Sequence, residues 1–362
     1  MDEKPQARPG LPVSVMLEMS RIAPKHFEFD RLAREPSVLF ERSGLSEFHG
    51  SVWNSGRKEQ INNAISSGKL QLVNHDLIEE LSLTHSKFHA MLHDMGVRVP
   101  PAVIHLTMPD GRKTTALIGQ QLPEDIPLWV KKVSFDEEGQ HFGHRGAGIS
   151  FVIPRSIKDI TPSHDHEFYQ QFVVPPDGYI RDIRVYVVGD KIIPGYIRRA
   201  TKKLTRGNLS GLFIPDKEQF VTAEHPGKIE PLEGELKEKV VKEAQKVRRA
   251  LIERIKRRRT DLAKQDVFGF GSIDFLLDAN GEPIVSEFDV GPEIRNVNGL
   301  SDRLAKEVAE YLAKKAGKKR TIHVLVASRN EFNASMLSHL KKIFPDKRLV
   351  TKKPLLEVVY RL

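Results

Sequence analysis

The pattern of apolar and polar residues predicts two amphipathic helices. Apolar residues recur at helical spacing in 75–95 and in 233–264, and charged residues fill the remaining positions of the second range. Gly96 and the two prolines that follow it end the first pattern. We therefore expect one helix in each range.

Strands are predicted on both sides of the second helix. The ranges with strand-like patterns are 102–107, 127–135, 149–153, 168–174, 181–193, 271–277 and 283–290. The turn dipeptide Asp110-Gly111 follows the first of them and predicts a hairpin within 107–118. Residues 323–360 read as strand, helix and strand. Together these patterns predict an α+β (α/β) protein.

We divide the chain into four predicted units. They are a short N-terminal lobe (1–75), a small lobe with a glycine-rich loop (76–167), a large lobe (168–318) and a C-terminal β-α-β segment (319–362). No long low-complexity linker separates them, so we expect the lobes to pack together.

The stretch DEEGQHFGHRGAG, at 136–148, holds four glycines between two predicted strands and fits no regular element. The backbone of such a loop could fold over phosphate groups. Histidines lie in or near it, at His141, His144, His164 and His166. Their spacing would also allow a zinc site, but a polar loop holds histidines for many reasons. We favour phosphate contact.

Composition narrows the class of protein. Lys and Arg number 57 against 48 Asp and Glu, and the formal charge of +9 suits an anionic partner such as a nucleotide, an acidic peptide or RNA. Part of the excess is the run KRRR at 256–259, which is more often a solvated helix face. The absence of cysteine excludes disulfides and thiolate catalysis. Without an apolar stretch of membrane-spanning length or a signal sequence, we expect a cytoplasmic protein.

Three carboxylates, Asp274, Glu287 and Asp289, fall on two predicted strands joined by a tight turn. Glu287 and Asp289 are two residues apart and point to one face, so the three side chains could converge. Carboxylate oxygens suit Mg²⁺, which also keeps phosphate and water ligands. Such a pair is often only an exposed strand face, but the apolar surroundings favour a bound cation.

Candidate phosphate-binding cations occur in the same part of the chain. They are Lys87, Lys131, Arg184, Arg198 and Arg206. A triphosphate and a developing acyl phosphate need several fixed positive charges. Each of these residues alone is more often a surface cation, and only their combination points to phosphate chemistry.

In this order the motifs resemble the ATP-grasp superfamily, especially its glutathione synthetase and ribosomal-protein glutamate ligase branch. QQFVVPPDGYIRDIRVYVVGDKII is similar to the branch's hinge and D-I-R strands. TRGNL is similar to its R-x-N-L motif, and IDFLLDANGEPIVSEFDVGP to its metal motif. The match covers about residues 75–315. It implies an ATP-grasp fold, in which two α+β lobes grip ATP between them.

The resemblance also implies roles for individual residues. ATP would be bound by Lys87, Lys131, the adenine hinge Gln171, Phe172 and Val173, and Asp182, Arg206 and Asn208. The implied metal is Mg²⁺, as two ions and with Mn²⁺ as an alternative, held by Asp274, Glu287 and Asp289. Arg198 and Arg184 would be catalytic, with Arg198 steadying the acyl phosphate.

Three features depart from the family pattern. Asp289 stands where the family usually has asparagine, which adds a charge to the metal site. The glycine-rich loop is longer than usual, and the N-terminal lobe is shorter. The C-terminal β-α-β segment could replace part of that lobe.

The implied reaction is ATP-dependent ligation of a carboxylate, from an amino acid or a peptide, to an amine. It would pass through an acyl phosphate and release ADP and phosphate. Two alternatives stay open: an ATP-grasp kinase of a small molecule, and a non-catalytic nucleotide- or RNA-binding protein, which the KRRR run would suit. We rank RNA binding lower because it gives the carboxylates no role. The substrates are open, as is the oligomeric state, for which a homodimer and a tetramer are both compatible with the sequence.

Overall fold

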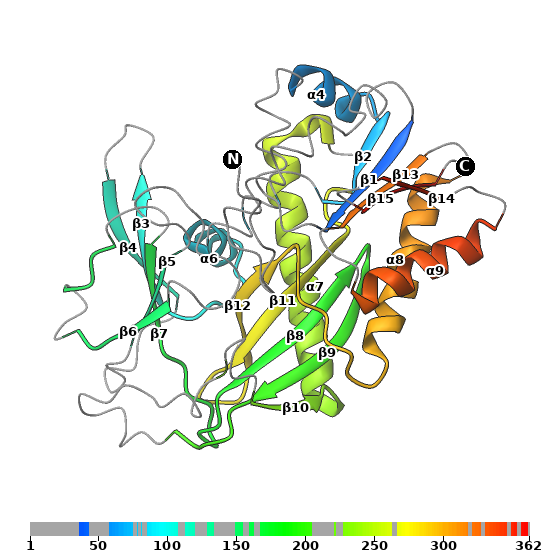
Figure 1. The fold of residues 1–362 in the computed structure, drawn as a ribbon. Coiled ribbons are helices and arrows are strands. Elements are labelled where there is room, and N and C mark those ends of the chain that lie inside the picture. Colours follow the sequence, from blue (N-terminus) through cyan, green and yellow to red (C-terminus); the bar gives the residue numbers. More distant parts are fainter. Residues whose placement is uncertain are drawn as a thin grey trace, which may run out of the picture.

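The computed structural model describes residues 36–42, 58–74, 78, 81, 85–107, 113–119, 129–133, 149–154, 159–162, 167–204, 221, 227–262, 266–317, 321–326, 330–345, 349–352 and 356–360. Within these residues the strands form three five-stranded sheets (Figure 1). We call them the small, the central and the terminal sheet.

The small sheet is antiparallel, with the strand order β4-β3-β7-β5-β6. Its strands are β3 (Ala102–Thr107), β4 (Lys113–Ile118), β5 (Trp129–Val133), β6 (Ile149–Val152) and β7 (Glu167–Gln171). Helix α6 (His85–Asp94) packs against this sheet, and the rings of His89 and Phe168 lie 5.1 Å apart. On its other side α6 contacts the central sheet, where Phe88 stacks on Phe288. The helix therefore lies between the two sheets (Figure 1).

The central sheet is also antiparallel, with the order β10-β9-β8-β11-β12. Its strands are β8 (Arg181–Val188), β9 (Lys191–Arg199), β10 (Lys228–Pro231), β11 (Phe270–Leu277) and β12 (Pro283–Asp289). Helix α7 (Gly234–Arg258) runs along one face and is followed by a short 3₁₀ turn, η5 (Thr260–Leu262) (Figure 1). Its buried stripe, including Val240, Val247 and Leu251, shares a core with Ile183 and Phe275 of the sheet. Burial of this stripe holds the charged helix in place.

The terminal sheet joins segments from both ends of the described chain. Its order is β14-β15-β13-β1-β2, and β1 pairs in parallel with β13 and with β2. The strands are β1 (Ser37–Arg42), β2 (Leu70–Leu72), β13 (Thr321–Val326), β14 (Leu349–Lys352) and β15 (Leu356–Tyr360). This topology supports the hypothesis that the C-terminal segment completes the N-terminal lobe.

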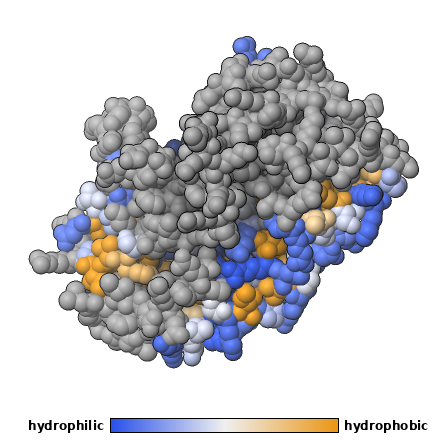
Figure 2. Space-filling view, viewed as in Figure 1, coloured by the Kyte–Doolittle hydropathy of each residue, from blue (hydrophilic) through white to orange (hydrophobic). Residues whose placement is uncertain are grey.

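Helices α4 (Lys58–Ser66), α8 (Leu300–Ala316) and α9 (Glu331–Ile343) accompany the terminal sheet. Apolar residues of α8 and α9 form one core with Phe40 of β1, Ile322 of β13 and Phe270 of the central sheet. The lower right margin of the molecule, where α8 and α9 lie, shows mostly hydrophilic residues (Figure 2). The two helices thus bury their apolar faces between the sheets and leave their polar faces outside.

The expected α+β architecture is confirmed. The predicted strands reappear as β3 to β9, β11 to β13 and β15, and the predicted helices as α6, α7 and α9. The elements not predicted are β1, β2, β10, β14, α4 and α8. Short strands such as β2, with three residues, carry too few positions for a readable alternation. The domain boundaries stay a prediction.

None of the helices in the described parts of the chain is long and apolar enough to cross a membrane.

Candidate active site

Six of the predicted site residues share one face of the central sheet, which we call the polar face. They are Asp182, Arg184, Arg198, Asp274, Glu287 and Asp289. Cross-strand pairing puts Asp274 opposite both Arg184 and Glu287, and Asp182 opposite Arg198. Since paired residues and those two apart point to the same side, the register brings all six together.

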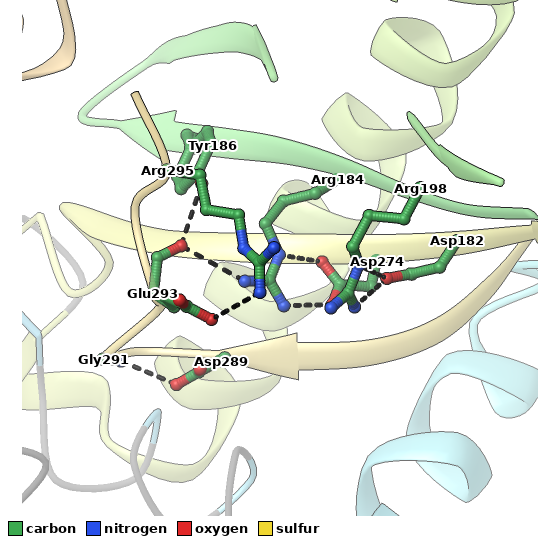
Figure 3. A network of polar contacts seen from close by, with 9 residues as sticks. All are labelled: Asp182, Arg184, Tyr186, Arg198, Asp274, Asp289, Gly291, Glu293 and Arg295. Carbon is green, nitrogen blue, oxygen red and sulfur yellow. Dashed lines mark hydrogen bonds and ion pairs between the residues drawn. The ribbon is translucent and has the colours of Figure 1, made fainter. Parts of the chain in front are cut away.

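Arg184 and Asp274 form a buried ion pair at the centre of this face (Figure 3). The guanidinium donates from Nε to Asp274 Oδ1 at 2.8 Å and from Nη2 to Oδ2 at 2.5 Å. Arg184 is 8% exposed and Asp274 is 3% exposed. Burial opposes the charge of Arg184, but the Asp274 carboxylate outweighs it and raises the guanidinium pKa above its usual value. The pair is rigid because both bonds of the fork are made.

Arg198 and Asp182 form a second ion pair, nearer the start of β8. Arg198 Nε donates to Asp182 Oδ2 at 2.7 Å, and Nη2 donates to the same oxygen. Burial, and then repulsion from Asp274, raises the pKa of Asp182, although Arg198 and Arg184 pull it down. Burial works against the charge of Arg198, but the pKa of this arginine is raised because Asp182 and Asp274 stabilise the cation.

The three predicted metal ligands differ in how many of their carboxylate oxygens already accept hydrogen bonds. Both oxygens of Asp274 are bound to Arg184, and Asp289 Oδ1 accepts from the Gly291 amide at 2.7 Å. In the described part of the chain no group of three or more acidic or histidine side chains could hold a metal ion. Asp274 is therefore paired with Arg184, and the assignment of all three carboxylates to a metal ion stays a prediction.

The half-buried Glu287 and Asp289 still suit magnesium. They lie two residues apart on β12, on the polar face, and present the hard oxygen donors that this ion takes. Mg²⁺ is commonly held by one or two carboxylates together with substrate phosphates and water. Glu287 and Asp289 supply two carboxylates, which fits this way of binding Mg²⁺.

A pair of bulges shapes the polar face. The register shifts between Arg184 and Val185, which leaves Gly195 of β9 as an extra residue, and again after Asp274, which leaves Ser286 of β12. At Gly195 an added Cβ would lie 2.5 Å from the Arg184 carbonyl oxygen, so only glycine lets β9 approach this closely. The bulges lie beside Arg184 and Asp274, which the regular β8–β11 register places opposite each other.

The predicted adenine hinge borders a pocket of about 360 Å³. Residues 171–174 line it together with residues 96–99 and 101 and with the turn 278–280. Gln171 is 4% exposed, and its Nε2 atom has no hydrogen-bond partner. The volume falls in the range of about 300–1,000 Å³ usual for small-molecule sites. The hinge thus offers both a cavity and an unused hydrogen-bond donor.

An ion pair closes one side of this pocket. Arg98 Nη2 donates to Asp278 Oδ2 at 2.5 Å, which ties the segment after α6 to the turn between β11 and β12. The backbone amide of Val285 also donates to the Arg98 carbonyl at 3.1 Å. The pocket wall is therefore held to the edge of the central sheet.

The remaining predicted residues are less fully described. Lys87 is exposed in the first turn of α6, and Lys131 lies in β5, where only its backbone pairing with Tyr169 and Ser150 is described. Arg206, Asn208, the glycine-rich loop and the four histidines lie outside the described residues.

Sequence reasoning missed three residues around the polar face, namely Tyr186, Glu293 and Arg295. The Glu293 carbonyl accepts from Tyr186 Oη at 3.0 Å and from Arg184 Nη1 at 3.3 Å (Figure 3). The loop 290–299 is thereby fixed over the sheet. The available signals were the position of Tyr186 in the β8 alternation and the closeness of Arg295 to Asp289 in the sequence.

Comparison with known proteins returns ligases. No protein-family model matches the chain. A tetrahydromethanopterin:α-L-glutamate ligase from Methanococcus maripaludis is 32% identical over 83 residues, which are 21% of this chain and 28% of that protein. The matched segment therefore spans less than a third of the relative.

Solved structures give looser likenesses. An L-amino acid ligase from Bacillus licheniformis aligns with a TM-score of 0.33 and 18% identity, over 59% of this chain and 42% of that one. The ATP-grasp ligase PsnB, complexed with a minimal precursor, Mg and ADP, aligns with a TM-score of 0.35 and 13% identity. That alignment covers 70% of this chain and 68% of PsnB.

Proposed function

We propose that this chain is an ATP-grasp ligase, which uses ATP and Mg²⁺ to activate a carboxylate as an acyl phosphate and couples it to an amine. The observation that carries the proposal is the polar face. It joins one buried and one half-buried arginine–aspartate pair with two half-buried carboxylates, beside a hinge pocket. Phosphoryl transfer is catalysed mainly by positioning and by neutralising charge, and this face supplies fixed charges of both signs.

In the proposed reaction the hinge pocket takes the base, and the phosphates extend over the polar face. A substrate carboxylate oxygen attacks the γ-phosphorus, the bond to the bridging oxygen breaks, and ADP leaves. The amine nitrogen then attacks the acyl carbon, loses a proton, and expels phosphate. Arg198 and Arg184 stabilise the negative charge that develops on the transferred oxygens.

Glu287 and Asp289 are the residues that would hold magnesium, which supplies neutralisation of the phosphate charge. Asp274 acts through Arg184, because its two oxygens hold the guanidinium in place. The likeness of an 83-residue segment to a glutamate ligase supports a carbon–nitrogen ligase with amino-acid substrates.

The test is product formation with ATP and Mg²⁺ against a panel of amino acids, dicarboxylic acids and short peptides. We expect ADP and free phosphate in equal amounts, with an amide in the mass spectrum that needs ATP. A kinase would yield ADP and a phosphorylated product without free phosphate. Glu287→Gln should abolish turnover, and the exposed Glu238→Gln on α7 is the matched control. Absence of ADP release across the panel would refute the proposal.

A further inference from the structure

Arg295 stands apart from the other two arginines near the polar face because its charge is poorly matched. Its Nη2 lies 3.5 Å from Glu293 Oε2, and the Glu293 side chain is 59% exposed. Its Nε is buried and has no hydrogen-bond partner. By contrast, Arg184 makes close bonds to the buried Asp274, and Arg198 makes them to the half-buried Asp182. A buried donor without a partner is costly, so a ligand that accepts from it gains affinity.

The position of Arg295 is fixed by its neighbours. Glu293, its ion-pair partner, offers its main-chain carbonyl to Arg184 and Tyr186 (Figure 3). Burial raises the pKa of Tyr186, so this hydroxyl stays protonated and keeps donating to the carbonyl. Arg295 is therefore held beside the Arg184–Asp274 pair and not on a free surface loop. Its side chain is only 20% exposed.

The order of residues along β8 indicates which ligand Arg295 meets. The hinge leads into β8, so Asp182 is nearest to the pocket, Arg184 follows and Tyr186 comes last. From Asp182 to Tyr186 the strand advances by about 13 Å at the usual rise per residue. The loop that carries Arg295 is attached to Arg184 and Tyr186, the end away from the hinge. A nucleotide bound at the hinge would leave this end to the other substrates.

Resting on the proposed function, we infer that Arg295 is a specificity-determining residue that binds a non-reacting carboxylate of a substrate. The forked guanidinium suits a carboxylate, which can accept two bonds from it. The carboxylate has two sources: the second acid group of a dicarboxylic donor, or the carboxyl group of an amino acid that supplies the amine.

The experiment measures binding by calorimetry, with the full chain, Mg²⁺ and a non-hydrolysable ATP analogue. In one arm glutarate is compared with its monoamide, and in the other glycine is compared with glycinamide. We expect the acid to bind roughly tenfold or more tightly than its amide in at least one arm, as loss of a charged hydrogen bond predicts. The arm that discriminates identifies the source of the carboxylate.

Arg295→Gln should reduce that ratio to about one, and Arg295→Lys should retain part of it, since lysine keeps the charge without the fork. Glu293→Gln removes the competing carboxylate and should tighten binding of the acid by up to about fivefold. The control is Arg303→Gln, which removes an exposed arginine on α8 and should change nothing. The analogue should bind each variant within about twofold of the wild-type affinity.

The inference is overturned if the wild-type protein does not discriminate in either arm, or if Arg295→Gln leaves the ratio unchanged. If Arg295→Gln no longer binds the ATP analogue, the inference is also overturned, because the arginine would then contact the nucleotide. Binding of the acid without any binding of the analogue to the wild-type protein has a different meaning. It would refute the proposed function and leave the carboxylate site standing.

Discussion

At the scale of single residues, the polar face depends on charges that are buried in pairs. Arg184 and Asp274 are both buried, and the desolvation penalty of either charge would be large without the other. Such a pair adds little net stability, because desolvation offsets the attraction. Its value is positional, since Arg184 also holds the carbonyl of the loop that bears Arg295.

We predict that Asp274→Asn destabilises the protein by about 3–5 kcal/mol, because it leaves Arg184 buried without its carboxylate. The double change Arg184→Met with Asp274→Leu should regain most of that loss, since it removes both charges, but neither protein should turn over ATP. Urea denaturation of both proteins measures the difference. The exposed pair Arg257–Glu253 is the control, and Glu253→Gln should cost less than about 1 kcal/mol. Equal costs at the two sites would contradict the prediction.

The raised pKa of Asp182 predicts a pH dependence of stability. Above the ordinary aspartate pKa of about 3.9, the folded chain keeps a proton that the unfolded chain has lost. The stability from this proton is present at acidic pH and is lost as pH rises through the raised pKa. The slope should be at most about 1.4 kcal/mol per pH unit. Denaturation at several pH values from 4 upward should show this slope in the wild-type protein and not in Asp182→Asn.

Asp302 provides a comparison of opposite sign. Hydrogen bonds from Ser335, and then from His339, lower its pKa. Its contribution is therefore present above the ordinary aspartate pKa and is lost as pH falls through the lowered value. In the wild-type protein this causes part of the decrease in stability at acidic pH. Asp302→Asn should abolish that part. If Asp182→Asn and Asp302→Asn shift the profile in the same direction, the account of Asp182 is wrong.

At the scale of elements, a single glycine controls how β9 meets β8. We predict that Gly195→Ala destabilises the protein by about 1–3 kcal/mol, because its methyl group would overlap the Arg184 carbonyl and crowd the Tyr186 ring. The backbone at Arg184 must shift, so affinity for nucleotide should fall as well. Denaturation and titration with an ATP analogue measure the two effects. Unchanged affinity would mean that the bulge does not position Arg184.

The sequence was informative wherever an element is long and its alternation regular. The charges of β8 and the carboxylates of β12 fall two residues apart, so their shared face could be predicted. What could not be predicted was pairing between strands. Nothing in the order of residues shows that Asp274 faces Arg184, or that a bulge at Gly195 alters the register. Arg295 was missed for a related reason, because a loop has no period from which its direction can be read.

At the scale of the whole molecule, both ends of the described chain support the sheet that carries the site. The core that includes Phe40 of β1 also includes Tyr186 and Phe270 of the central sheet and Phe332 of α9. Phe40 meets Phe270 edge to face at 5.5 Å. The terminal sheet is therefore packed on the central one, and we expect the two to unfold as a unit.

This shared core makes Phe40 a test of cooperativity. Phe40 is 0% exposed, so Phe40→Ala should cost about 3–5 kcal/mol through the cavity that it leaves. Because β1 also joins β2 to β13, the loss should spread beyond the N-terminal segment. Amide exchange should therefore accelerate in β11 as much as in β13, with one unfolding transition. Leu117→Ala, at a residue 49% exposed on β4, is the control and should cost less than about 0.5 kcal/mol. Faster exchange confined to β1 and β13 would show instead that the terminal sheet unfolds by itself and that the site does not depend on it.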